Sequence, residues 1–260
     1  MSKRTPLIVA NWKMNKTTVE AVLLMQDILN RLNPGEMDSH EVVVCPPFID
    51  LKQVATVIEY DRSEVRLGAQ DVHWRPDGAY TGAISVRMLA AVGCRFCIVG
   101  HSERRQMFRE GDQEVAWKLE ALLDGGIAPI LCVGEPAEVR ERGRRAAEDF
   151  VLQQVKAALS TVDTALAAKL AVAYEPIWSI GTGAAATPED AQRMAAAIRD
   201  CLRQLFGDVA ERLRILYGGS LNVGNVAMFA PQPDLDGGLI GGASLDAQAF
   251  SQMVQLWRDQ

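Results

Sequence analysis

The chain has 260 residues, of which 48% are hydrophobic and 23% are charged, a composition typical of a globular protein and not of a disordered one. Its 27 lysines and arginines and 33 aspartates and glutamates give a formal net charge of −6, which argues against binding to nucleic acid or to an anionic membrane surface. Because no apolar stretch approaches the roughly 20 residues of a membrane span, and the first apolar run is too short for a signal peptide, we expect a cytoplasmic location.

Short apolar runs recur along the chain, and each is predicted to be a buried strand. In chain order they cover residues 7–10, 42–45, 65–69, 96–99, 128–133, 170–174, 213–217 and 239–240. Segments of helical period lie between them. After the first run, Val19, Val22, Leu23, Gln26 and residues 29–30 share a predicted face, and after the sixth run Met194, Ile198, Cys201 and Leu205 share another.

Residues 187–190 (Thr-Pro-Glu-Asp) predict a helix start, because a hydroxyl stands at the N-cap, proline follows, and acids occupy the first turn. Continuous apolar strands that alternate with helices indicate a parallel sheet covered by helices. Eight such units predict closure, so we expect an α/β fold consisting of one eight-stranded parallel β/α barrel over residues 1–260. An open doubly wound sheet is the alternative, but no run is followed by the G-x-G-x-x-G phosphate turn.

One strand end carries a carboxylate in a distinctive setting. Glu175 follows the apolar run 170–174 and precedes Pro176, which restricts the backbone at Glu175, and the loop beyond contains Gly181 and Gly183. Such a segment could hold a catalytic base at a fixed root beside a movable loop. The alternative is an ordinary solvated acid at the end of a strand.

Other strand ends add complementary groups. In parallel barrels functional residues gather at the carboxyl ends of the strands. The first strand ends in Asn-Trp-Lys-Met-Asn (residues 11–15), the fourth in Gly-His-Ser-Glu-Arg-Arg (100–105), the seventh in Tyr-Gly-Gly-Ser (217–220) and the eighth in Gly-Gly-Ala-Ser (241–244). Together with Glu175 after the sixth strand, they supply a base, a neutral acid, a cation and a ring of backbone donors.

These segments, in this order, resemble the triosephosphate isomerase family, and the resemblance covers essentially the whole chain. It implies a TIM barrel and an aldose-ketose isomerase of glycolysis and gluconeogenesis that interconverts dihydroxyacetone phosphate and D-glyceraldehyde 3-phosphate through an enediolate. It also implies a cytoplasmic homodimer. Since neither a metal-ligand cluster nor a nucleotide motif is visible, we expect no cofactor and no metal.

The resemblance assigns roles to individual residues. Glu175 is the expected base, with a pKa raised by an apolar closed site, and His101 is the expected electrophile, kept neutral by the helix start that follows it. Lys13 is expected to attract the dianionic substrate and Asn11 to position the substrate or the lysine. Glu103 is expected to be a supporting acid close to the reacting groups, or else a partner of the arginines that follow it.

Phosphate binding requires backbone N–H groups that approach the ligand closely. The positions that match the family are Gly181, Ser220, Gly241 and Gly242. Residues 176–187 are predicted to form a lid that closes over the substrate. A β-branched residue at position 181 or 183 should therefore lower turnover and leave the fold intact.

Some positions depart from the family pattern. Ala83 stands where the family usually has a glutamate that pairs across the dimer with the arginine matching Arg104, so we predict a weakened homodimer. Ser179 and Ala184 are unusual within the lid. His73 and Trp74 occur in relatives that act on four-carbon ketose phosphates, which keeps an isomerase of four-carbon (erythrulose phosphate type) sugars as an alternative.

Two further alternatives come from other classes of function. The barrel could be a lyase in which Lys13 forms a Schiff base, and trapping with borohydride would detect that adduct. It could also be a noncatalytic scaffold that binds sugar phosphates, although the presence of both Glu175 and His101 argues against this.

Overall fold

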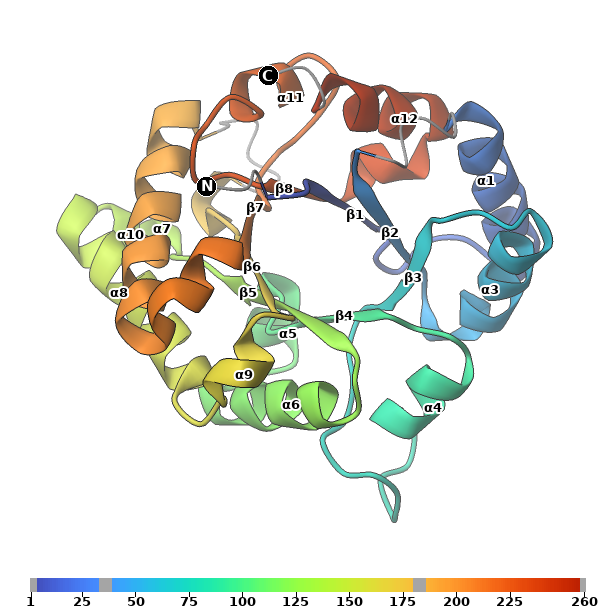
Figure 1. Cartoon of the computed structure of the whole chain (residues 1–260), viewed down its shortest axis with the longest axis horizontal. Coiled ribbons are helices and arrows are strands. Elements are labelled where there is room, and N and C mark those ends of the chain that lie inside the picture. Colours follow the sequence, from blue (N-terminus) through green and yellow to red (C-terminus); the bar gives the residue numbers. More distant parts are fainter. Residues whose placement is uncertain (1–3, 33–38, 180–185, 258–260) are drawn as a thin grey trace.

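The computed structural model describes residues 4–32, 39–179 and 186–257. Within them, eight parallel strands follow one another in sequence order around a closed barrel, and the first strand pairs with the last (Figure 1). The strands are β1 (Leu7–Asn11), β2 (Glu41–Cys45), β3 (Arg66–Ala69), β4 (Phe96–Val99), β5 (Ala128–Val133), β6 (Ala171–Tyr174), β7 (Arg214–Tyr217) and β8 (Gly237–Ile240).

Helices surround the barrel and connect successive strands (Figure 1). They are α1 (Thr18–Arg31), α3 (Leu51–Tyr60), α4 (Val86–Ala91), α5 (Ser102–Met107), α6 (Asp112–Asp124), α7 (Ala137–Arg140), α8 (Arg144–Leu159), α9 (Thr164–Ala167), α10 (Pro188–Phe206), α11 (Val226–Phe229) and α12 (Ala247–Leu256). Short 3-10 helices are η1 (Phe48–Asp50), η2 (Ile177–Ser179), η3 (Gly207–Arg212) and η4 (Gly242–Leu245). No helix in the described ranges is both long and apolar enough to span a membrane.

The predicted fold class is confirmed, and the predicted helix start before α10 is confirmed as well. Thr187 caps α10 by accepting a hydrogen bond from the Asp190 N–H (3.1 Å), and Pro188 is the first helical residue. Of the predicted apolar face of α10, Met194, Ile198 and Cys201 are buried and Leu205 is partly buried.

The predicted face of α1 was wrong. Val19 and Leu23 are 70% and 59% exposed, whereas the buried residues of this helix are Ala21, Leu24, Met25 and Ile28. Apolar residues occupy most of the circumference of α1, so two helical faces compete in the sequence. Packing against the neighbouring helices α3 and α12 selects the second face.

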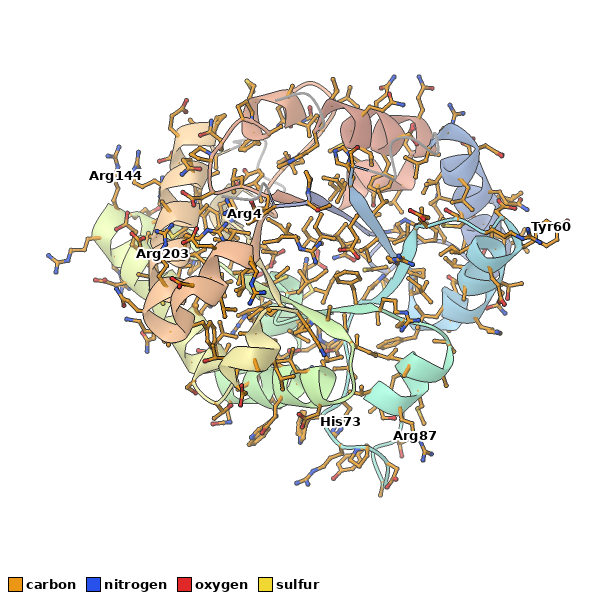
Figure 2. All side chains as sticks on the ribbon, viewed as in Figure 1. Arg4, Tyr60, His73, Arg87, Arg144 and Arg203 are labelled. Atoms are coloured by element: carbon orange, nitrogen blue, oxygen red, sulfur yellow. The ribbon has the colours of Figure 1, made fainter. Side chains whose placement is uncertain are left out.

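The apolar interior has two layers, because side chains alternate between the two faces of each strand. One layer fills the space between the barrel and its helices, and the other fills the barrel itself. The inner layer consists of Leu7, Val9, Val43, Cys45, Phe96, Ile98, Ile130, Cys132, Ala171, Ala173, Leu216 and Leu239. All-atom sticks show side chains crowding the centre of the ring (Figure 2).

The barrel closes through a glycine. Gly237, the first residue of β8, pairs with Leu7 and has a φ of +147°. A Cβ atom at this position would lie 1.9 Å from the carbonyl oxygen of Leu7, so a side chain there would separate the two strands that complete the ring.

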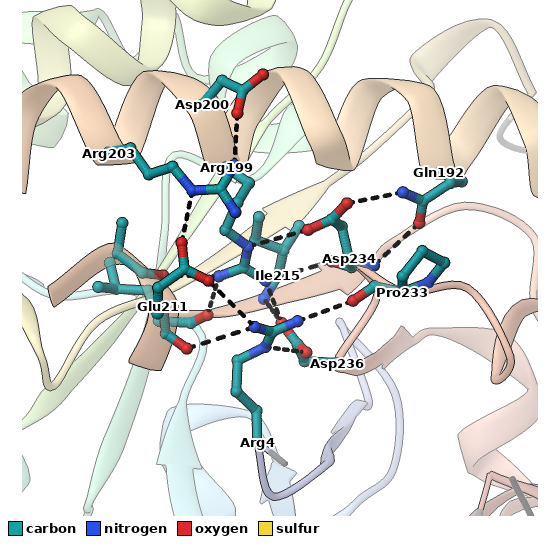
Figure 3. A network of polar contacts seen from close by, with 12 residues as sticks. Arg4, Gln192, Arg199, Asp200, Arg203, Glu211, Ile215, Pro233, Asp234 and Asp236 are labelled. Atoms are coloured by element: carbon teal, nitrogen blue, oxygen red, sulfur yellow. Dashed lines mark hydrogen bonds and ion pairs between the residues drawn. The ribbon is translucent and has the colours of Figure 1, made fainter. Parts of the chain in front are cut away.

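A polar network lies at the amino ends of β7 and β8, away from the strand ends that carry the predicted site (Figure 3). The fully buried guanidinium of Arg199 donates to Asp236 (2.7 Å) and to the carbonyl oxygens of Ala210 and Leu213. Asp236 also accepts from Arg4 (2.5 Å). A buried charge must be paired and hydrogen-bonded, and this network meets that need.

The segment between β3 and α4 projects from the side of the barrel (Figure 1), and His73 lies in it (Figure 2). The ring of His73 stacks on Trp74 (centroids 4.2 Å apart) and contacts Tyr80 (4.3 Å). Trp74 in turn contacts Trp117 of α6 (5.2 Å). These rings hold the two arms of the projecting segment together and against α6.

Candidate active site

A cavity of about 320 Å³ opens at the carboxyl ends of the strands. It is lined by Asn11, Lys13, His101, Glu175, Gly218, Gly219, Ser220, Leu221, Leu239, Gly241, Gly242 and Ala243. Seven of the nine residues predicted for the site are in this lining. Glu103 joins the site through Lys13, and Gly181 lies outside the described residues, as does half of the predicted lid, residues 180–185.

Side-chain alternation carries the functional groups into this cavity. Leu7 and Val9 point into the barrel, and Asn11 continues their row at the end of β1. Ala173 likewise points inward, and Glu175 lies two residues further on. The period of two along a strand therefore brings both side chains over the top of the inner apolar layer.

Glu175 and His101 are in direct contact. Glu175 is 2% exposed and His101 is 6% exposed, and the distance between Oε1 of Glu175 and Nε2 of His101 is 3.0 Å. The second oxygen of Glu175, Oε2, accepts a hydrogen bond from the backbone N–H of Ser102 (2.9 Å). The carboxylate is thus held at the start of α5.

The surroundings of His101 indicate which ring nitrogen carries a proton. The backbone N–H of Glu103 donates to Nδ1 of His101 (3.2 Å). A protonated ring nitrogen cannot accept a hydrogen bond, so Nδ1 carries no proton in this contact. Nε2 then bears the proton and donates to Glu175. His101 is the N-cap of α5, so the predicted helix start after it is confirmed.

The charges of the pair affect both pKa values. Burial raises the pKa of Glu175, but His101, the Ser102 N–H and Lys13 lower it by more, so the pKa lies below its usual value. Burial lowers the pKa of His101, but the carboxylates of Glu175 and Glu103 raise it by more. With the contact to His101 in place, the shift in the pKa of Glu175 is opposite to the one expected for this residue in a closed apolar site, and it favours an ionised base. The carboxylates of Glu175 and Glu103 favour the charged form of His101, against the prediction of a neutral ring. The hydrogen bond from the Glu103 N–H to Nδ1 favours the neutral form.

Lys13 extends across the mouth of the barrel. Its ammonium nitrogen lies 2.6 Å from Oε1 of Glu103, and Oε2 of the same carboxylate lies 3.7 Å from Nδ1 of His101. Glu103 therefore pairs with Lys13. The alternative, in which Glu103 pairs with the following arginines, is wrong: Arg105 pairs with Asp112 (2.6 Å), and the partners of Arg104 are other acids.

Sequence reasoning missed the groups that surround the backbone of Glu175. Glu135 is fully buried after β5, and its Oε1 accepts from the Tyr174 hydroxyl (3.1 Å) and from Nε1 of Trp178 (2.8 Å). A Cβ atom at Gly134 would lie 1.7 Å from the carbonyl oxygen of Glu175. The only sequence clue is the dipeptide Gly134-Glu135 directly after the fifth apolar run, which is too common to predict this role.

Two positions that depart from the family pattern can be located. The hydroxyl of Ser179, at the end of η2, donates to the carbonyl oxygen of Pro176 (2.9 Å), the residue that precedes η2. Ala83 lines a second cavity of about 350 Å³ together with Arg104. Ala184 lies outside the described residues.

Arg104 has acidic partners in its own chain. Its guanidinium pairs with Asp71 (2.8 Å) and Glu110 (2.7 Å), and both acids also contact Lys118. Although Arg104 lacks the glutamate expected at position 83, its charge is neutralised inside the subunit.

Comparison with known proteins identifies close relatives. A family profile described as "Triosephosphate isomerase" matches residues 6–257. Triosephosphate isomerases of Corynebacterium diphtheriae and Corynebacterium glutamicum are 48% and 47% identical to the chain over 252 residues, covering 96% of each protein. That of Roseiflexus sp. is 48% identical over 96% of this chain and 97% of its own.

Proposed function

Because the chain belongs to the triosephosphate isomerase family, and so interconverts dihydroxyacetone phosphate and D-glyceraldehyde 3-phosphate in glycolysis, we propose that Glu175, His101 and Lys13 perform the chemistry. The observation that carries this proposal is that all three line one cavity of about 320 Å³. The volume suits a small sugar phosphate.

Glu175 is the proposed base, which removes a proton from the carbon beside the substrate carbonyl and returns it to the neighbouring carbon. A base must be ionised to accept a proton, and the lowered pKa of Glu175 meets this requirement. Glu175 and His101 now bond to each other (3.0 Å), so a substrate that reaches both must exchange this contact for its own.

His101 is the proposed electrophile. With the proton on Nε2, the ring can donate to a substrate oxygen and stabilise the enediolate as negative charge develops. The backbone N–H that donates to Nδ1 supports this protonation state.

Lys13 is the proposed fixed cation for the dianionic substrate, and Asn11 the proposed group that orients it. Asn11 accepts a hydrogen bond from the Lys13 backbone N–H (3.0 Å), which supports a positioning role. Glu103 neutralises the ammonium at 2.6 Å, so an incoming phosphate ester competes with Glu103 for Lys13.

The phosphate group is proposed to lie against Ser220, Gly241 and Gly242, with Gly181 contributing from the lid. The first three line the cavity. Gly241 lies so close to Lys13 that a Cβ atom would be 3.1 Å from Cε of the lysine, which supports a compact site where backbone and ammonium meet one anion.

The four-carbon alternative is not favoured. His73 and Trp74, which suggested it, are absent from the described lining of the active-site cavity and belong to the projecting segment instead. A coupled assay with three-carbon and four-carbon aldose and ketose phosphates tests the preference, with Glu175→Ala as the control. We expect the three-carbon pair to have the higher kcat/KM and Glu175→Ala to lose about 10²–10⁴-fold in kcat. A higher kcat/KM for the four-carbon pair would overturn this assignment.

The lyase alternative also has little support. A Schiff base requires a neutral amine, whereas Lys13 makes an ion pair with Glu103 at 2.6 Å. Borohydride treatment with dihydroxyacetone phosphate should therefore give no covalent adduct.

We further propose that residues 1–260 form one domain, that the protein is cytoplasmic, and that it is a homodimer. The described elements all belong to one closed barrel, which supports a single domain. Large exposed apolar side chains support the homodimer: Met14 is 96%, Ile49 73%, Met107 72% and Phe108 67% exposed, and Phe108 lines the second cavity. Adjacent apolar side chains that are exposed together, as Met107 and Phe108 are, are typical of a surface that contacts a partner.

A further inference from the structure

Lys13 has an unusual backbone conformation. Its φ is +52°, in the left-handed region that a residue with a Cβ atom seldom adopts. Such a conformation persists only where the surrounding structure enforces it, and it is often found at functional sites. The contacts that enforce it at Lys13 therefore bear on where the ammonium group lies.

Two side chains bond to the peptide groups of Lys13. The backbone N–H donates to Oδ1 of Asn11 (3.0 Å), and the carbonyl oxygen accepts from Nε2 of Gln70 (2.9 Å). Asn11 lies two residues before Lys13, at the end of the same strand, β1. Gln70 comes from the end of a different strand, so its bond ties the Lys13 carbonyl to a second part of the barrel.

Gln70 joins three neighbouring strands. It follows the last residue of β3, and its Nε2 also donates to the carbonyl oxygen of Cys45, the last residue of β2 (2.9 Å). That same carbonyl accepts from the backbone N–H of Trp12, directly after β1 (3.1 Å). One amide group thus fixes the exits of β1, β2 and β3 relative to one another.

We propose that Gln70 is a positioning residue for Lys13. By donating to the Lys13 carbonyl it maintains the left-handed backbone, and this conformation directs the side chain across the barrel mouth to the point where Nζ meets Glu103. Gln70 is not in the described lining of the cavity, so it acts through Lys13 and not on the substrate. The inference rests on the proposed role of Lys13.

The rival explanation is that Gln70 only stabilises the fold. Gln70→Met separates the two, because methionine keeps the length of the side chain and removes both hydrogen bonds. We expect kcat/KM to fall by about 10- to 100-fold, the scale of a misplaced catalytic group. In a Lys13→Ala background the same substitution should change kcat/KM by less than about twofold, since no ammonium remains to be positioned.

Each outcome has a distinct meaning. An equal loss in both backgrounds, or no loss in the wild-type background, would overturn the role of Gln70 and leave that of Lys13 intact. If Lys13→Ala itself has no effect, the proposed function of Lys13 fails and the inference fails with it. Where Lys13→Ala turns over too slowly to assay, the dissociation constants of glycerol 3-phosphate, measured by NMR titration, allow the same comparison of Gln70→Met in the wild-type and Lys13→Ala backgrounds. If Gln70→Met does not fold, Gln70→Asn, which keeps the amide on a shorter side chain, replaces it.

Gln192 offers a matched control. It also makes two hydrogen bonds, both with Asp234, in the network at the other end of the barrel (Figure 3). Gln192→Met should lower the melting temperature about as much as Gln70→Met, while kcat/KM stays within about twofold of wild type. A comparable loss of kcat/KM in Gln192→Met would show that the effect of Gln70→Met is not specific to the lysine.

Discussion

The ring of His101 has neighbours that favour opposite protonation states. The carboxylates of Glu175 and Glu103 favour imidazolium, whereas the N–H that donates to Nδ1 and the start of α5 favour the neutral ring. Protonation of Nδ1 would break a hydrogen bond to a backbone donor inside a buried site. A ring that stays neutral is the weaker acid, but it can pass a proton between two substrate oxygens without first having to lose one.

We predict that ¹⁵N NMR of the histidine side chains at neutral pH shows the Nε2–H tautomer for His101. His101→Gln keeps an amide donor near the Nε2 position but cannot shuttle a proton, so kcat should fall by about 10²–10⁴-fold. A control substitution of His73, whose ring lies in the projecting segment, should leave kcat within about twofold. A doubly protonated His101 ring at neutral pH would contradict the proposed electrophile.

At the scale of elements, the strands were predictable because buried parallel strands form continuous apolar runs. Residues 96–99 and 128–133 agree with β4 and β5 at both ends. Strand ends then located the segments of the site, since a closed barrel brings all these ends together, and the resemblance to the family selected the seven lining residues within them. The sequence could not reveal Gln70 or Gly134. The role of Gln70 depends on the backbone angle of Lys13, and that of Gly134 on the close approach of its backbone to Glu175. Neither feature leaves a local sequence pattern.

Gly134 gives a test at this scale, because it lies where β5 and β6 end side by side. A methyl group there would lie 1.7 Å from the carbonyl oxygen of Glu175, so Gly134→Ala must displace the chain segment that carries the base. We expect kcat/KM to fall by about 10²-fold or more in a protein that still folds. Gly111→Ala is the control, because a Cβ atom there meets no atom within 4 Å. If Gly134→Ala kept the wild-type kcat/KM, the close approach of residue 134 to the Glu175 carbonyl would not be what fixes the position of the base.

At the scale of the whole molecule, a partly buried ion cluster joins the projecting segment to the barrel. It contains Asp71, Arg104, Glu110 and Lys118, two acids and two bases with their opposite charges in contact. Burial raises the pKa of Glu110, but Lys118 and Arg104 lower it by more, so the pKa lies below its usual value of 4.5. The ionised form of Glu110 therefore stabilises the folded state.

Glu110→Gln should lower the free energy of unfolding by about 3 kcal/mol at neutral pH, because it leaves two cations, the buried Lys118 and the partly buried Arg104, with one acid. Since the folded-state pKa of Glu110 is depressed, its contribution is fully present above pH 4.5 and is lost as the pH falls through the folded-state value. Denaturant unfolding of both proteins between neutral and acid pH measures this difference. A difference that does not shrink below pH 4.5 would exclude Glu110 as its source.

The proposed homodimer should be weakened by Ala83, so wild-type protein should dissociate at nanomolar concentration. Ala83→Glu supplies an acid at the position where the family pairs across subunits, and it should lower the dimer dissociation constant about tenfold, equivalent to about 1.4 kcal/mol. Ala79→Glu, which adds the same charge to the same segment, should not. Light scattering or mass photometry on dilution measures both, and an intact wild-type dimer at nanomolar concentration would refute the weakening.

Pairing of β1 with β8 also bears on how the chain is made. During synthesis, β1 emerges first and its final partner emerges last, more than 220 positions later, because Leu7 pairs with Gly237. Until the ribosome has released that last strand, every intermediate has two unpaired sheet edges, which can template association with other chains. Translation arrest shortly before residue 237 should thus produce nascent chains that depend strongly on chaperones.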